Sequence, residues 1–133
     1  MTSEKNTSEA YVLVVLTVGK SDNGKNATLA FSCGLSALAM GRRSAVFLTS
    51  DGAIWGYSGS ADDIRVQGFP MLGELISNYI DSGGEVILCS VCHKTCSSGS
   101  PNQPNNAIML DGVTIGGFAS MIDRGIDGMT VTF

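Results

Sequence analysis

Three of the four cysteines in this chain lie within one short segment, CSVCHKTC. The segment holds Cys89, Cys92 and Cys96, with His93 and Lys94 between the last two. A thiolate is a strong nucleophile, and positive charge or a helix N-terminus lowers the pKa at which it forms. A second thiol close by can resolve a disulfide or persulfide formed on the first. These five residues are therefore the candidate site, and they indicate thiol chemistry.

Two metal-centred interpretations of the same segment are less favoured. The order Cys89-x-x-Cys92-His93 matches the attachment pattern of c-type haem. Proteins with such haems are exported, however, and the polar N-terminus MTSEKNTSEA does not resemble a signal peptide. A zinc site could use Cys89, Cys92, His93 and Cys96, but the sequence has no second, distant ligand pair. We therefore predict neither a metal nor a cofactor.

A purely structural role is the remaining alternative. Cysteine is among the most frequently buried residue types, so Cys89 could simply complete a core strand. Cys33 lies among apolar neighbours and fits this description well. Three cysteines within eight residues fit it poorly, because packing alone does not require such a cluster.

The composition excludes several classes of protein. A chain of 133 residues with 44% apolar residues has room for one folded domain. The net charge of −4 and the scattered eight Lys and Arg argue against nucleic acid as a partner. The longest apolar run, Tyr11 to Val18, is far shorter than the roughly 20 residues that span a bilayer. We therefore expect no membrane partner and a cytoplasmic location.

Strands and helices are predicted to alternate along the chain. Continuous apolar runs typical of strands covered on both faces occupy 11–18, 45–49 and 85–89. Helices are expected at 27–41 and 70–80, followed by shorter elements and a final strand at 130–133. This order predicts a flavodoxin-like, three-layer α/β domain with a mostly parallel sheet of about five strands. We expect the three apolar runs to be parallel neighbours in the middle of that sheet.

The domain is expected to span 10–133, after a disordered tail at 1–9. In open parallel sheets, sites form beyond the carboxyl ends of the strands. The loops 19–26, 50–69 and 89–106 leave those ends, and the last contains the cysteines. Cys89 continues a buried strand, so we expect it to be the more buried thiol. Cys92 should be the more exposed thiol, with a pKa lowered by helix amides, His93 and Lys94.

The order of several sequence blocks resembles the DsrE/DsrF-like (TusBCD-related) sulfur-relay family. The resemblance covers residues 10–133 and is carried by VLTVGKSDNGKNATLAF, AVFLTSDGAIW, GFPMLGELISNYIDSGGEVILCSVC and MTVTF. Members of the family are small cytoplasmic oligomers in which a strand-end cysteine carries persulfide sulfur. By position, Cys89 matches that cysteine, and Cys92 matches the second cysteine of a C-x-x-C variant. Cys96 has no counterpart in the family pattern.

The resemblance implies a cytosolic sulfur-relay or thiol-transfer protein that forms a homo-oligomer, either a trimer or a hexamer. Its partners would be sulfur donor and acceptor proteins or small thiols. The low share of charged residues, 15%, also favours an oligomer, because little polar surface is available to cover a small domain. The alternative from another class is a non-catalytic oligomeric binding protein whose cysteine cluster holds zinc or is structural.

Overall fold

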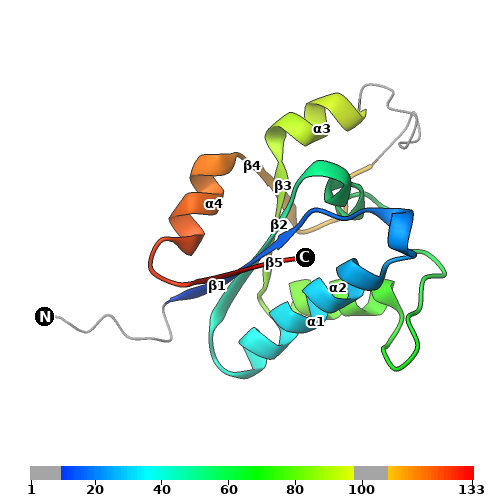
Figure 1. Ribbon diagram of the computed structural model, residues 1–133, viewed down its shortest axis with the longest axis horizontal. Coiled ribbons are helices and arrows are strands. Elements are labelled where there is room, and N and C mark those ends of the chain that lie inside the picture. Colours follow the sequence, from blue (N-terminus) through cyan, green and yellow to red (C-terminus); the bar gives the residue numbers. More distant parts are fainter. Residues whose placement is uncertain (1–9, 98–107) are drawn as a thin grey trace, which may run out of the picture.

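The computed structural model describes residues 10–97 and 108–133 (Figure 1). The predicted tail at 1–9 and the second half of the expected loop at 89–106 lie outside the described residues. The strands are β1 (Tyr11–Leu16), β2 (Arg43–Leu48), β3 (Glu85–Cys89), β4 (Val113–Gly116) and β5 (Met129–Thr132). The α-helices are α1 (Lys25–Ala39), α2 (Leu72–Asp81), α3 (Ser90–Ser97) and α4 (Phe118–Gly125). Two 3₁₀-helices, η2 (Lys20–Asp22) and η3 (Ser50–Gly56), follow β1 and β2.

The five strands form one parallel sheet in the order β4-β3-β2-β1-β5. The predicted parallel α/β architecture is therefore confirmed, and the three continuous apolar runs are its three central strands. The reason is that a central strand is covered on both faces, so both sets of alternating side chains must be apolar. The sheet is entirely parallel, which goes slightly beyond the prediction of a mostly parallel one.

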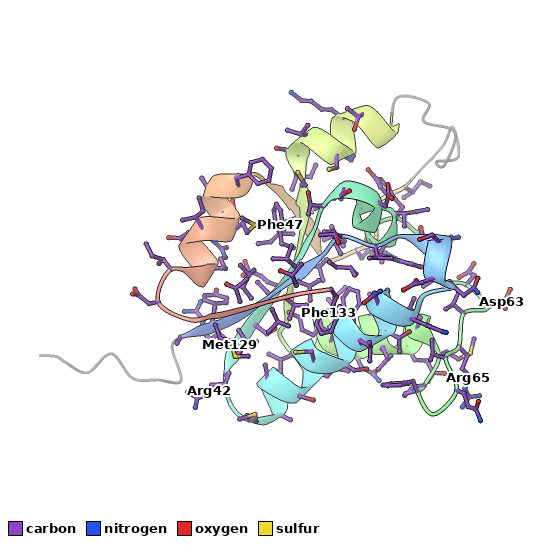
Figure 2. All side chains as sticks on the ribbon, viewed as in Figure 1. Arg42, Phe47, Asp63, Arg65, Met129 and Phe133 are labelled. Carbon is purple, nitrogen blue, oxygen red and sulfur yellow. The ribbon has the colours of Figure 1, made fainter. Side chains whose placement is uncertain are left out.

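The two faces of the sheet are covered unequally. Val14, Val46 and Val86 point to the face covered by α1 and α2, where most of the core lies. Leu13, Ala45 and their neighbours point to the other face, against α4 and the start of α3 (Figure 1). Phe47 lies on this second face, with its ring centroid 6.3 Å from that of Phe118 (Figure 2). One short helix thus covers most of the second face.

The chain enters α3 directly from β3, where the sequence suggested a loop beginning at residue 89. No glycine or proline occurs between Cys89 and Ser97, so nothing in the sequence prevents helix formation at once. The stretch after β2, expected to be irregular, begins instead with the 3₁₀-helix η3. Both differences place a helical turn immediately after a central strand.

Close backbone contact fixes η3 to the end of β1. Gly52 donates its N–H to the carbonyl of Thr17, with nitrogen and oxygen 3.1 Å apart. A Cβ atom at Gly52 would overlap the carbonyl of Leu16, so only glycine allows this approach. Trp55 completes the attachment, because its indole N–H donates to the carbonyl of Val18 at 2.9 Å. The position of η3 is therefore set by β1.

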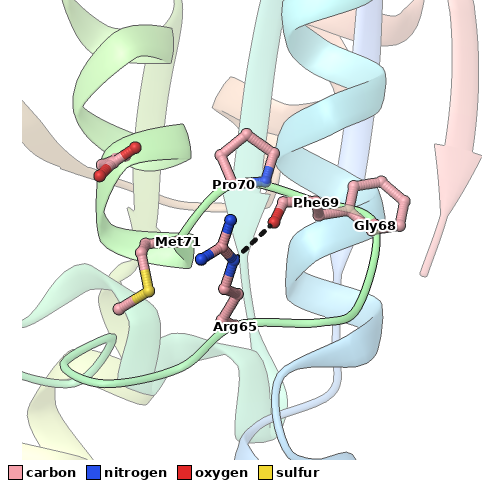
Figure 3. A pocket seen from close by; sticks show the side chains of 6 residues that line it. Arg65, Gly68, Phe69, Pro70 and Met71 are labelled. Atoms are coloured by element: carbon pink, nitrogen blue, oxygen red, sulfur yellow. Dashed lines mark hydrogen bonds between the residues drawn. The ribbon is translucent and has the colours of Figure 1, made fainter.

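Residues 65–71, the part of this segment just before α2, form a loop of their own. A bridge between Arg65 and Met71 closes it, and Arg65 Nε donates to the Phe69 carbonyl at 3.2 Å (Figure 3). A cavity of about 400 Å³ opens here, next to Glu74 and Pro70. None of the five candidate site residues lines it.

An ion pair between Arg124 of α4 and Glu85 of β3 joins the helix to the sheet. Arg124 Nε lies 3.0 Å from one carboxylate oxygen of Glu85, and Arg124 Nη2 lies 2.7 Å from the other. The hydrogen bonds from Arg124 outweigh desolvation and lower the pKa of Glu85. This contribution to stability is present above the unfolded pKa of glutamate, about 4.3, and disappears as pH falls through the folded value.

We therefore expect Arg124→Met to lower the free energy of unfolding by about 1 kcal/mol at neutral pH, since the pair is partly exposed. Urea titrations should show this difference shrinking in acid. Arg42→Met is the control, because Arg42 has no ion-pair partner among the described residues. A pH-independent difference would contradict this role for the ion pair.

Candidate thiol site

Cys89 is the last residue of the central strand β3 and is only 1% exposed. The preceding strand fixes its orientation, because alternating side chains place it in the same core cluster as Ile87 and Phe47. Its neighbour in the register of β4 is Gly116. The expectation that Cys89 is the more buried of the C-x-x-C pair is correct, since Cys92 is half-buried.

Cys89 also occupies the N-cap position of α3, which begins at Ser90. A side chain at this position can accept hydrogen bonds from the backbone N–H groups of the second and third helical residues. These residues are Val91 and Cys92, and both N–H groups donate to the Cys89 sulfur. Burial raises the pKa of the Cys89 thiol, but these bonds, with those from the Thr49 hydroxyl and the Cys92 thiol, lower it overall. The helix therefore stabilises the Cys89 thiolate.

Cys92 lies between this thiol and the end of β2. The backbone N–H of Ser50 donates to Cys92 Sγ at 3.2 Å, and Thr49 Oγ1 lies 3.7 Å from the same sulfur. Ser50 adopts a left-handed conformation with φ of 55°, directly after β2. Burial raises the pKa of the Cys92 thiol, the Thr49 and Ser50 bonds oppose this, and the adjacent Cys89 charge raises it further. Its pKa is raised overall.

The prediction that Cys92 would have the lowered pKa is thus wrong. The first-turn amides of a helix point back toward the residue that precedes it, which is Cys89. The two sulfurs hydrogen-bond to each other, so they titrate as a pair in which Cys89 ionises first. In the resulting state Cys89 is a thiolate that accepts a hydrogen bond from the protonated Cys92 thiol.

His93 pairs with an aromatic residue of the neighbouring segment. Its Nδ1 lies 2.7 Å from the Tyr57 hydroxyl, and the two rings are stacked with centroids 5.9 Å apart. Lys94 is exposed on α3. Burial has the largest effect on the pKa of both thiols, and hydrogen bonds with backbone amides, Thr49 and the other cysteine come next, with neither His93 nor Lys94 among these causes. The expected role of these two residues in favouring the thiolate therefore stays a prediction.

Cys96 lies in the last turn of α3, and its side chain is outside the described residues. Within residues 10–97 and 108–133, no group of three or more His, Cys, Asp or Glu is placed to hold a metal ion. Cys89, Cys92 and His93 thus do not form a zinc site by themselves.

Sequence reasoning missed Thr49, Ser50 and Tyr57. A signal for Thr49 was available, because the apolar runs that end at Thr49 and Cys89 were expected to be parallel neighbours. Aligning the ends of those runs places the two residues side by side, as the register Leu48↔Leu88 does in the structure. Nothing in the spacing of the sequence indicated Tyr57.

We expect Tyr57→Phe to raise the pKa of Cys89 toward the ordinary cysteine value, because α3 loses the hydroxyl contact that positions its first turn. The free energy of unfolding should fall by about 1 kcal/mol. Thiolate ultraviolet absorbance followed against pH measures the first effect. Tyr79→Phe removes another buried hydroxyl, bonded to Ser44 and away from the thiols, and should change stability only. Equal titrations for Tyr57→Phe and wild type would contradict the positioning role.

Fold and site together define an α/β protein with a thiol pair at the carboxyl edge of a parallel sheet. The DsrE/DsrF-like family model matches residues 11–133, and the chain belongs to this family. The family is generally related to sulfur relay.

The structure of the ychN protein from E. coli is similar, with a TM-score of 0.63 and 17% sequence identity. The match covers 94% of this chain and 99% of that one, and it supports the fold. No curated protein sequence matches the chain. None of the helices in the described part of the chain has the length and apolar character needed to span a bilayer.

Proposed function

We propose that this chain is a cytosolic sulfur-relay or thiol-transfer protein that carries persulfide sulfur on the Cys89–Cys92 pair. The observation that carries the proposal is the contact between the two thiols at the carboxyl edge of the sheet, where α3 stabilises one of them as a thiolate. Cys92 is half-buried and can be reached from solvent, whereas Cys89 is the thiol that carries the negative charge. Family membership supports sulfur as the group that is carried.

In the proposed function each neighbouring residue would have a role. The Ser50 N–H and Thr49 hydroxyl hold the Cys92 sulfur in place and can donate to a negative charge on it. The amides of Val91 and Cys92 do the same for Cys89. Sulfur donors and acceptors would be proteins or small thiols able to approach Cys92.

Intact-mass spectrometry of the purified protein, with and without reductant, tests this function against the alternative of a zinc-binding or structural cluster. We expect the Cys89→Ser chain, which cannot form a Cys89–Cys92 disulfide, to show added masses of one or more sulfur atoms that reductant removes. One stoichiometric zinc ion per chain under native conditions, with no sulfur adduct, would support the binding protein instead. Cys33→Ser serves as a control, because Cys33 lies in α1 on the other side of the sheet.

The proposed function includes assembly into a homo-oligomer, a trimer or hexamer, through the α4 face. Phe118, Ile122 and Ile126 recur every four residues and are 57%, 57% and 70% exposed. Beside them a cavity of about 410 Å³ opens onto Leu13 and Val15 of the incompletely covered sheet face. A small domain does not ordinarily leave such an apolar stripe in water. The stripe begins two residues after Gly116, the register partner of Cys89, so assembly here would enclose the thiol site.

Sedimentation of the wild-type protein at micromolar concentration is expected to give a mass several times the 13.8 kDa of one chain. Ile122→Asp should shift the mass to that of the monomer, because a charge would be buried in the interface. Leu29→Asp on α1 is the matched control, since Leu29 is 43% exposed but lies on a helix that covers the other face. A monomeric wild-type protein would rule out this assembly.

A further inference from the structure

The two sulfurs of the site differ in what can reach them. Cys89 is enclosed by the sheet and the first turn of α3, whereas Cys92 is half-buried. Sulfur brought by another molecule must therefore arrive at Cys92. A persulfide formed there would have the Cys89 sulfur beside it, because Cys92 lies in the first turn of α3, directly after Cys89, and packs against the same core cluster.

We propose that Cys89 resolves a persulfide held on Cys92, so that the chain releases hydrosulfide and forms a Cys89–Cys92 disulfide. This inference rests on the proposed function, because it requires sulfur on Cys92. The Cys89 thiolate attacks the inner sulfur of Cys92–S–SH, the new bond joins the two cysteine sulfurs, and the S–S bond to the outer sulfur breaks. The outer sulfur leaves with the electron pair and its proton as HS⁻. The two cysteines supply the electrons, and the outer sulfur is reduced.

The arrangement favours attack on the inner sulfur over attack on the outer one. Displacement at sulfur places nucleophile, central sulfur and leaving group on one line. Cys89 is enclosed and Cys92 is half-buried, so a leaving sulfur on Cys92 has a path to solvent when Cys89 attacks the inner sulfur. Attack on the outer sulfur would instead move it onto the enclosed Cys89, out of reach of a sulfur acceptor.

The donors around Cys92 support the same step. The Ser50 N–H and the Thr49 hydroxyl fix the Cys92 sulfur beside Cys89, which keeps the two reacting atoms in place before reaction. Once the disulfide has formed, neither cysteine can accept further sulfur. A dithiol reductant would regenerate both thiols by thiol–disulfide exchange. The chain would then deliver one sulfur atom per reduction cycle.

A single-turnover experiment tests the step. Reduced protein, freed of reductant and oxygen, is mixed with a small-molecule persulfide, and hydrosulfide and intact mass are measured. The wild-type chain should release about one hydrosulfide and become a Cys89–Cys92 disulfide, identified by peptide mapping. Cys89→Ser should keep one added sulfur on Cys92 and release at least about tenfold less hydrosulfide. Cys89→Ala serves if the serine variant does not fold.

Cys33→Ser is the control and should behave as the wild type does, because Cys33 lies in α1 on the other side of the sheet. A wild-type chain that keeps its persulfide, with no disulfide, would overturn the inference and leave the carrier function standing. Hydrosulfide release by Cys89→Ser at the wild-type level would also overturn it. If no chain takes up sulfur, the proposed function and this inference both fail.

Discussion

Replacing Cys89 by serine is expected to abolish the thiolate that this protein forms below the ordinary pKa of cysteine. In the wild type, burial raises the pKa of Cys89, but donors from α3, Thr49 and Cys92 lower it overall. The serine hydroxyl does not ionise in this range, so the first step of the titration disappears. Cys92 then titrates without a neighbouring charge, which removes one of the causes that raise its pKa.

Cys92→Ser should retain the early thiolate, because the backbone N–H groups of Val91 and residue 92 remain. Thiolate absorbance against pH is the appropriate measurement, since Cys89 is too enclosed for labelling alone to report its charge. Cys33 and Cys96 contribute equally to all three chains, and their signals cancel in the differences. An early thiolate that survives Cys89→Ser and vanishes in Cys92→Ser would show that the assignment is reversed.

Gly52→Ala is expected to lower the free energy of unfolding by about 2 to 3 kcal/mol, because the added methyl would collide with the backbone of β1. The collision partner is the Leu16 carbonyl, which belongs to a central strand and cannot yield as a flexible side chain would. Relief would require η3 to move. Since Ser50 begins η3 and donates to Cys92, the substitution should also weaken the hold on the Cys92 sulfur.

Thermal or urea denaturation measures the stability change, and alkylation of Cys92 reports the change at the site. Gly73→Ala is the matched control. Gly73 lies in α2 with nothing within 4 Å of the added carbon, and alanine favours a helix more than glycine does. That variant should be as stable as the wild type or slightly more stable. Equal stability for Gly52→Ala and the wild type would contradict the close approach of η3 to β1.

Most of the fold could be predicted from the sequence, because the central strands have a distinctive apolar pattern. Tyr11–Leu16, Arg43–Leu48 and Glu85–Cys89 are buried on both faces, and continuous apolar runs are the direct consequence. The helix expected at 27–41 ends at Gly41, and in the structure Gly41 follows α1 with a φ of 80°, which glycine adopts readily. The edge strand β5 covers Met129–Thr132 rather than the predicted 130–133, because a short, partly exposed strand has no long apolar run to mark its ends.

The chemistry of the site could be predicted only in part from the sequence, because it depends on residues that are close in space but distant along the chain. The local sequence supplied the C-x-x-C pair and the relative burial of its members. It did not show that α3 begins at Ser90, and that single residue decides which thiol receives the amide hydrogen bonds. The contacts from Ser50 and Tyr57 join segments more than 30 residues apart, and only the packing of η3 on the sheet brings them together.

The most direct test of the account is to map where incoming sulfur attaches. The reduced protein would be exposed to a persulfide donor carrying isotopically labelled sulfur, quenched with excess alkylating agent before the first turnover ends, and digested for peptide mass spectrometry. Labelled sulfur is expected on the peptide that contains Cys89 and Cys92, attached to Cys92 in the Cys89→Ser chain. Label on Cys33, or no label on any cysteine, would contradict it.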